Sequence, residues 1–151
     1  MKFFLIVISF VLVACNGQKK AVMGEQAVAN SESAGRLELI MQEDQGGFEG
    51  DEMLVIRDAK RLKSFFSKIN RTRKPGIPVP TIDFKKETLV VLCSGEHQNT
   101  LNSALELILE TDKEIQLKTI YNKEKIKGKA IVSPFKIYKI PFSDKEITFK
   151  E

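Results

Sequence analysis

The 151-residue sequence contains no tryptophan, one histidine, two cysteines and two tyrosines. Metal centres built from several histidines or cysteines, and frameworks of several disulfides, need more of these residues and are excluded. The near absence of tryptophan and tyrosine argues against a platform on which nucleic-acid bases or sugar rings stack. The 24 basic and 20 acidic residues give a net charge of +4, well short of a nucleic-acid-binding stripe. We therefore expect no metal, no cofactor and no nucleic-acid partner.

The N-terminus has the pattern of a secretory signal. A positively charged start is followed by an apolar run at 3–14, which is shorter than the roughly 20 residues that span a bilayer. The run ends in Leu12-Val13-Ala14-Cys15, which closely resembles a bacterial lipobox, the signal for cleavage and for attachment of diacylglycerol to the cysteine. The sequence therefore predicts a lipoprotein signal peptide at 1–14 and lipidation of Cys15. The alternative is an ordinary signal peptide with a chance cysteine.

The segment that follows is typical of a flexible linker. Residues 15–34 are rich in alanine, glycine, serine, asparagine and glutamine, without regular apolar spacing. Because two or more acyl chains anchor a protein stably where one does so only marginally, this segment is predicted to be a lipidated tether. We expect it to hold a domain of residues 35–151 at the cell envelope, outside the cytoplasmic membrane, in the periplasm or at an outer membrane.

The pattern of residues 35–151 predicts several strands and one helix. An alternating segment at 37–42 is expected to form a hairpin with 48–56. Asp58 is a candidate N-cap for a helix whose buried face has helical spacing and comprises Leu62, Phe65, Phe66 and Ile69. Further strands, the first three forming a meander, are expected at 88–93, 100–110, 114–121, 130–140 and 146–149. The expected fold is α+β: a single antiparallel β-sheet, or a partly sandwiched sheet, with one amphipathic helix.

One short segment invites a catalytic interpretation. Cys93-Ser94-Gly95-Glu96-His97 brings a thiol, a hydroxyl, a carboxylate and the only imidazole together. A nucleophile needs its base within hydrogen-bond reach, but side chains four residues apart at the end of a strand diverge. We interpret Cys93 as a buried core thiol and His97 as an exposed loop residue, and predict that the protein is not an enzyme.

Charged residues gather in three places. The first is acidic and comprises Glu43, Asp44, Glu49, Asp51 and Glu52. We interpret it as a solvated hairpin tip. The alternative is a calcium site, which would be weak because the EF-hand spacing is absent. Eight basic residues lie at 57–74. A candidate basic contact face comprises Lys123, Lys125, Lys127 and Lys129. Such faces contact anionic lipid headgroups, envelope polysaccharide or an acidic partner, although most are simply solvated.

From Ile77 to Phe149 the chain resembles the C-terminal domain family of the protease-complex subunit PrcB. The first shared pattern is Pro80-Thr81-Ile82-Asp83-Phe84, an apolar strand and then Gly95. The second is the run from Ser133 to Pro141, which contains Pro134 and Phe135 and ends in Ile-Pro. In place of the family's Thr-Gly-Gly-Tyr turn, the chain has Asn99-Thr100-Leu101-Asn102.

The motif residues of this resemblance have structural interpretations. An aspartate before a strand accepts backbone N–H groups in an Asx turn, a phenylalanine supplies the core, and a proline marks the start or bend of a strand. We therefore interpret these residues as fold markers first, and they are Asp83, Phe84, Gly95, Pro134 and Phe135.

The resemblance implies a non-catalytic accessory lipoprotein that binds and stabilises a cell-surface protease. The expected mode of binding is addition of an extended segment to a sheet edge. Two alternatives remain open. One is a sandwich-type protease inhibitor that inserts a loop such as 95–102 into a protease, and the other is an envelope lipoprotein that binds polyanions through its basic face.

Overall fold

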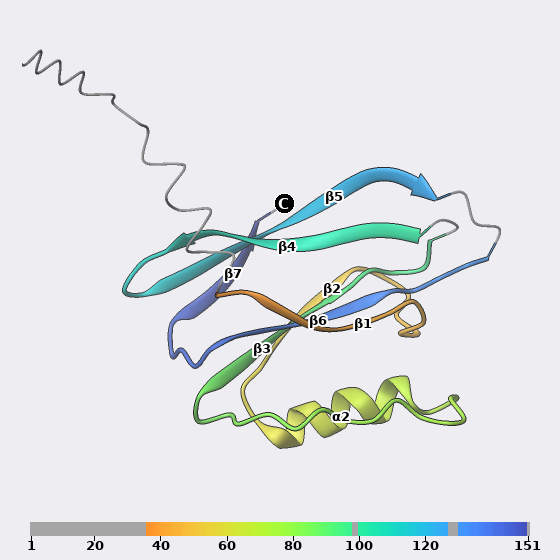
Figure 1. Cartoon of the computed structure of the whole chain (residues 1–151), viewed down its shortest axis with the longest axis horizontal. Helices are drawn as coiled ribbons and strands as arrows, with labels where there is room; N and C mark the ends of the chain where they lie inside the picture. The colour runs from red at the N-terminus through yellow and green to blue at the C-terminus, as the bar shows by residue number, and fades with distance from the viewer. Residues whose placement is uncertain (1–35, 98–99, 127–129, 151) are drawn as a thin grey trace, which may run out of the picture.

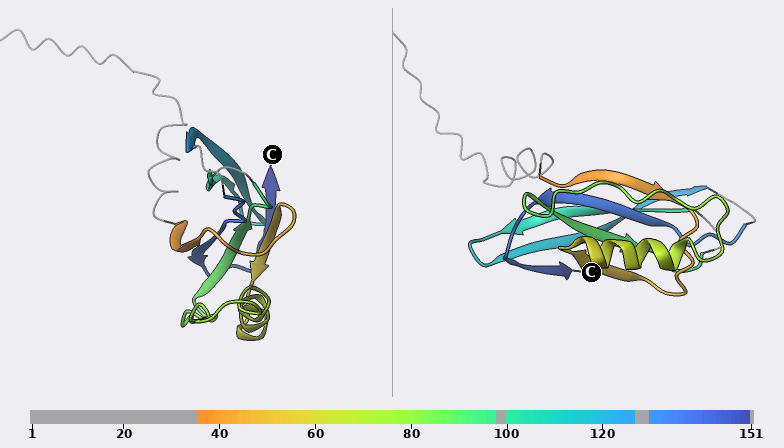
Figure 2. Two further views of the ribbon diagram at one scale, coloured as in Figure 1. Left: turned by 90° about the vertical axis from the view of Figure 1, so that its right-hand side faces the viewer. Right: turned by 90° about the horizontal axis from the view of Figure 1, so that it is seen from below.

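The computed structural model describes residues 36–97, 100–126 and 130–150 and arranges them in three layers (Figure 1). A helix covers one face of a four-stranded sheet, and a three-stranded sheet covers the other (Figure 2). The elements in chain order are β1 (Glu38–Glu43), β2 (Glu52–Ile56), α2 (Ala59–Ile69), β3 (Glu87–Cys93), β4 (Thr100–Glu110), β5 (Glu114–Ile126), β6 (Phe135–Pro141) and β7 (Glu146–Lys150). No helix among these described residues is long and apolar enough to cross a membrane.

The two sheets differ in how their strands pair. The first has the order β1-β6-β3-β2, and all of its pairs are antiparallel. The second has the order β4-β5-β7, in which β4 and β5 form an antiparallel hairpin and β7 runs parallel to β5. Strands β1 and β2 are therefore the two edges of the first sheet.

Strand β3 explains why the protein has two cores. Successive side chains of a strand point to opposite faces, and here both faces are apolar. Leu89, Val91 and Cys93 pack in the core beneath α2, while Val90 and Leu92 pack in the core between the sheets. Because one helix covers only one face, the continuous apolar run of β3 requires the second sheet as the other cover.

The helix forms where the sequence predicts it. Asp58 is its N-cap and accepts a hydrogen bond from the backbone N–H of Arg61 at 2.8 Å. Its buried face consists of the four expected residues, Leu62, Phe65, Phe66 and Ile69. The ring of Phe65 stacks on Phe48 at a centroid distance of 5.8 Å and meets Phe135 edge to face at 5.5 Å. These contacts join the helix to the β1–β2 connection and to β6.

Three expectations about the sheet are corrected. The α+β class is confirmed, but of the two expected arrangements, a single antiparallel sheet or a partly sandwiched one, the single sheet is wrong: there are two sheets, and the β5–β7 pair is parallel. The expected hairpin of 37–42 with 48–56 is wrong, because β1 pairs with β6 and β2 pairs with β3. The expected meander is wrong for its first strand, since β3 lies in a different sheet from β4 and β5. Alternation of apolar and polar side chains locates a strand but does not determine which strand it pairs with. Pairing depends on which apolar faces are buried together in the folded chain.

Candidate functional site

The thiol of the candidate catalytic segment is a core group, as expected. Cys93 is fully buried on the helix side of β3, and desolvation by burial raises the pKa of its thiol from 9.0 to about 12. The next residue faces the other way: the hydroxyl of Ser94 is buried and lies 3.0 Å from the hydroxyl of Ser103. The thiol is thus held protonated at neutral pH, which is unsuited to nucleophilic attack.

The interpretation of His97 as an exposed loop residue is wrong. Its backbone N–H donates to the carbonyl of Val132 at 2.8 Å and its carbonyl accepts from the N–H of Val132 at 2.9 Å. The half-buried imidazole has Nε2 at 3.7 Å from Oδ1 of Asp51, and the same carboxylate oxygen accepts the N–H of Gly95 at 2.8 Å. The residue is therefore part of a bridge between segments far apart in the sequence.

The acidic residues do not converge on one site. Glu43 lies on β1 and Glu52 on β2, at opposite edges of the first sheet. Glu43 pairs with Arg73 at 3.4 Å, and Glu52 pairs with Lys68 at 3.9 Å. Within the ranges that the structure describes, no group of three or more histidine, cysteine or acidic side chains is placed to hold a metal ion.

The motif residues lie at turns and in the core. Asp83 begins a turn before β3, in which its carboxylate accepts the N–H of Lys85 at 3.1 Å and its carbonyl accepts the N–H of Lys86 at 2.8 Å. The partly buried Phe84 packs against the core beneath α2. Buried Pro134 and Phe135 lie at the start of β6.

Gly95 occupies a close contact with another part of the backbone. A Cβ atom at this position would lie 2.7 Å from Cα of Gly50 and 2.8 Å from the carbonyl oxygen of Glu49. A side chain here requires the β1–β2 connection to move, so a glycine at this motif position has a packing reason.

The expected lipidation site and part of the expected basic contact face lie outside the described residues. Cys15 lies outside the described residues, as do Lys127 and Lys129. Lys123 and Lys125, expected in a polar connection, lie within β5, which extends to Ile126. The structure describes their backbone alone.

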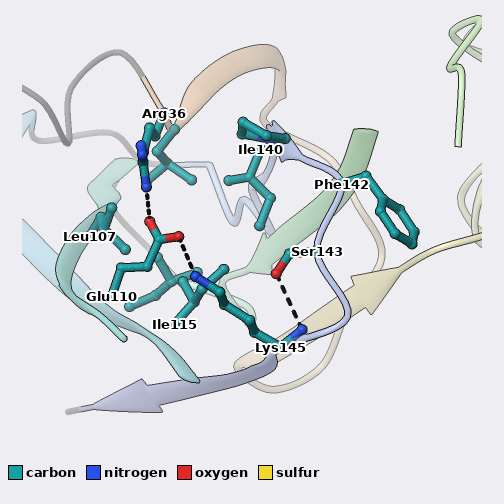
Figure 3. A pocket seen from close by; sticks show the side chains of 11 residues that line it. Arg36, Leu107, Glu110, Ile115, Ile140, Phe142, Ser143 and Lys145 are labelled. Atoms are coloured by element: carbon teal, nitrogen blue, oxygen red, sulfur yellow. Dashed lines mark hydrogen bonds and ion pairs between the residues drawn. The ribbon is translucent and has the colours of Figure 1, made fainter. Parts of the chain in front are cut away.

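One open end of the sandwich contains a cavity of about 240 Å³ (Figure 3). Its apolar lining includes Leu107, Ile115 and Ile140. At its rim Glu110 forms ion pairs with Arg36 and, at 2.8 Å, with Lys145. The carboxylate links the residues before β1 and before β7 to the end of β4.

A second hollow of about 370 Å³ lies between the edge strand β2 and the helix α2, and we call it the β2–α2 groove. Every second residue of β2 lines the groove, and these residues are Glu52, Leu54 and Ile56. The helix contributes residues spaced along one of its faces, which are Arg61, Ser64, Phe65 and Lys68. Phe48 and Val55 complete the lining. The helix has no acidic residue, and its basic residues are Lys60, Arg61, Lys63 and Lys68.

The groove is a feature that the sequence interpretation missed. The sequence predicts binding at a sheet edge. However, the predicted pairing of 48–56 with 37–42 is wrong, so β2 was not identified as an edge strand. The available signal was Arg61, Ser64 and Lys68 beside the buried stripe of the helix. These residues form an exposed flank of the helix beside its buried stripe.

The chain matches no protein-family model, no curated protein and no solved structure. The resemblance to the PrcB C-terminal domain family thus depends on the sequence motifs alone.

Proposed function

We propose that this protein is a non-catalytic, lipid-anchored envelope protein that binds a protein partner at the edge of β2. The observation that carries the proposal is the placement of an unpaired strand edge directly beside the β2–α2 groove. An edge strand presents unpaired N–H and C=O groups, and an extended polypeptide that adds to it satisfies them while its alternate side chains enter a neighbouring groove.

The anchor and the partner class come from the sequence. The lipobox-like segment supports lipidation of Cys15 outside the cytoplasmic membrane, and the motif resemblance supports an envelope or surface protease as the partner. The buried, protonated thiol of Cys93 supports the non-catalytic part of the proposal. Binding of an extended segment of the protease, or of its precursor, would stabilise that protease without any chemistry by this chain.

The proposal is tested by affinity isolation from detergent-solubilised envelope, followed by mass spectrometry. Ser64 is exposed and lines the groove, whereas Ser67 is exposed on the same helix outside the lining. We expect Ser64→Tyr to fill the groove and to abolish recovery of a stoichiometric partner that the unchanged protein and Ser67→Tyr both retain. Melting temperatures of the two variants control for folding.

Two results would contradict the proposal. The first is a partner recovered equally well with Ser64→Tyr, since that partner would bind elsewhere. The second is a partner protease whose turnover falls when this protein is added while its lifetime is unchanged, because that behaviour defines an inhibitor.

A further inference from the structure

We propose that the β2–α2 groove selects an extended segment of another protein in which the apolar side chains that enter the groove are flanked at both ends by acidic ones. This inference deepens the proposed function and rests on its assignment of the groove as the binding site. It concerns the chemistry of the occupant, which the groove's floor and rim specify separately.

The floor of the groove is apolar and continues the sheet. Leu54 and Ile56 belong to the core beneath α2, whereas Met53 belongs to the core between the sheets. A segment added beside β2 would follow the same alternation, about 4.8 Å away. Every second side chain would therefore lie on the helix side, against Leu54 and the stacked rings of Phe48 and Phe65.

The rim of the groove carries a net positive charge, because among the lining residues Arg61 and Lys68 face a single carboxylate, that of Glu52. Arg61 and Lys68 have side chains that are 72% and 57% exposed. Their carboxylate contacts are long, 3.7 Å to Asp58 for Arg61 and 3.9 Å to Glu52 for Lys68. Exposed ion pairs of this kind contribute about 0–1 kcal/mol each, so Arg61 and Lys68 can exchange them for a carboxylate of an incoming segment. Lys68 Nζ also lies 4.5 Å from the centroid of the Phe48 ring, which places its charge beside the apolar floor.

The same charge argues against a second copy of this chain as the occupant. Antiparallel pairing of β2 with β2 of another copy would extend one continuous sheet and place both α2 helices on the same face, beside the junction. Each helix carries four basic residues and no acidic one, so the two helices would repel one another. Charge complementarity therefore favours an acidic segment from a different protein.

The test uses two synthetic peptides of equal length, each with a central run of valines, flanked at both ends by two aspartates in one peptide and by two lysines in the other. Because successive side chains of a strand point to opposite faces, one residue of each charged pair lies on the helix side. Each peptide is titrated against the detergent-solubilised full chain at about 0.15 M salt, where charges more than about 8 Å apart are largely screened. The readouts are the dissociation constant and hydrogen exchange of the backbone amides at 52–56. We expect the acidic peptide to bind about tenfold more tightly than the basic one, because the two cations of the rim attract the first peptide and repel the second. We also expect the acidic peptide to slow hydrogen exchange at β2.

Charge-reversal variants supply the matched control. The double variant Arg61→Glu/Lys68→Glu is expected to reverse the preference between the two peptides. The double variant Lys60→Glu/Lys63→Glu makes the same change of charge on the same helix outside the groove lining. It is expected to keep the preference for the acidic peptide.

The outcomes separate this inference from the proposed function. Equal affinities, with both peptides protecting β2, overturn the acidic preference and leave the binding edge in place. Failure of both peptides to protect β2 overturns the inference, while the Ser64→Tyr isolation experiment judges the proposed function independently. If the protein has the mass of a dimer and β2 is protected without any peptide, the inference is overturned, and the occupant is a second copy of the chain. Protection by anionic phospholipid vesicles, and not by the acidic peptide, overturns the inference in favour of a membrane surface.

Discussion

Gly95 is held against the backbone of the β1–β2 connection, and the sequence alone gives it no obvious reason to be glycine. The Cβ of Gly95→Ala would lie within 3.0 Å of three backbone atoms of residues 49 and 50. We expect the variant to lose about 1–3 kcal/mol of unfolding free energy, because the strain of overpacking is of that size. Denaturant unfolding measures the loss.

A matched glycine lies on the other side of the same contact. A Cβ at Gly50 would meet nothing within 4 Å, so Gly50→Ala is expected to change the unfolding free energy by no more than about 0.5 kcal/mol. Equal midpoints for the two variants would show that the close approach at Gly95 does not constrain the fold.

Residues with local roles were predictable, and residues with distant partners were not. The cap at Asp58 and the turn at Asp83 act on backbone groups within four residues, so sequence spacing was sufficient to identify them. His97 bonds to Val132, and Asp51 to Gly95. These pairs form only when distant segments meet in the folded chain, and no spacing rule indicates them.

The helix α2 is the wall of the groove, so its stability bears on binding. Asp58→Ala removes the acceptor for the N–H of Arg61 and is expected to cost about 1 kcal/mol of unfolding free energy. Asp58→Asn keeps an acceptor of the same geometry and is expected to stay close to the unchanged protein. Thermal unfolding of the two variants compares them, and an asparagine variant as unstable as the alanine variant would contradict a capping role.

Strands were easier to locate than to pair. The expected meander pairs 100–110 with the strand that follows it, and the structure contains that pair. The continuous apolar run of β3 also marked a buried strand, yet it accepts neighbours from either direction. The actual neighbours, β2 and β6, are selected by the apolar faces they bring to both cores, and that selection made β2 an edge.

At the scale of the whole molecule, Glu110 ties three segments together at one end of the sandwich. The hydrogen bond from Lys145, and then that from Arg36, hold the pKa of this carboxyl below its usual value of 4.5. A carboxyl whose pKa is lower in the folded state stabilises the fold above its unfolded pKa, and this contribution is lost as the pH falls through the folded value.

The effect of pH on stability is therefore specific. Relative to Glu110→Gln, the unchanged protein is expected to be more stable at pH 7 and to lose that advantage progressively below about pH 4.5. The difference is expected to be small, up to about 1 kcal/mol for each ion pair, because both pairs remain in contact with solvent. Denaturant unfolding of both proteins across pH 3–7 measures it. A difference that stays constant or grows on acidification would contradict the role of this triad.

In the proposed function, a partner's polypeptide occupies the edge of β2. The most direct test places a photo-reactive amino acid at Ser64, in the groove, or at Ser67, outside its lining, in the full chain expressed in intact cells. Binding at the β2 edge predicts a discrete cross-linked protein from position 64 and none from position 67. Equal cross-linking at both positions, or cross-linking from position 67 alone, would contradict it.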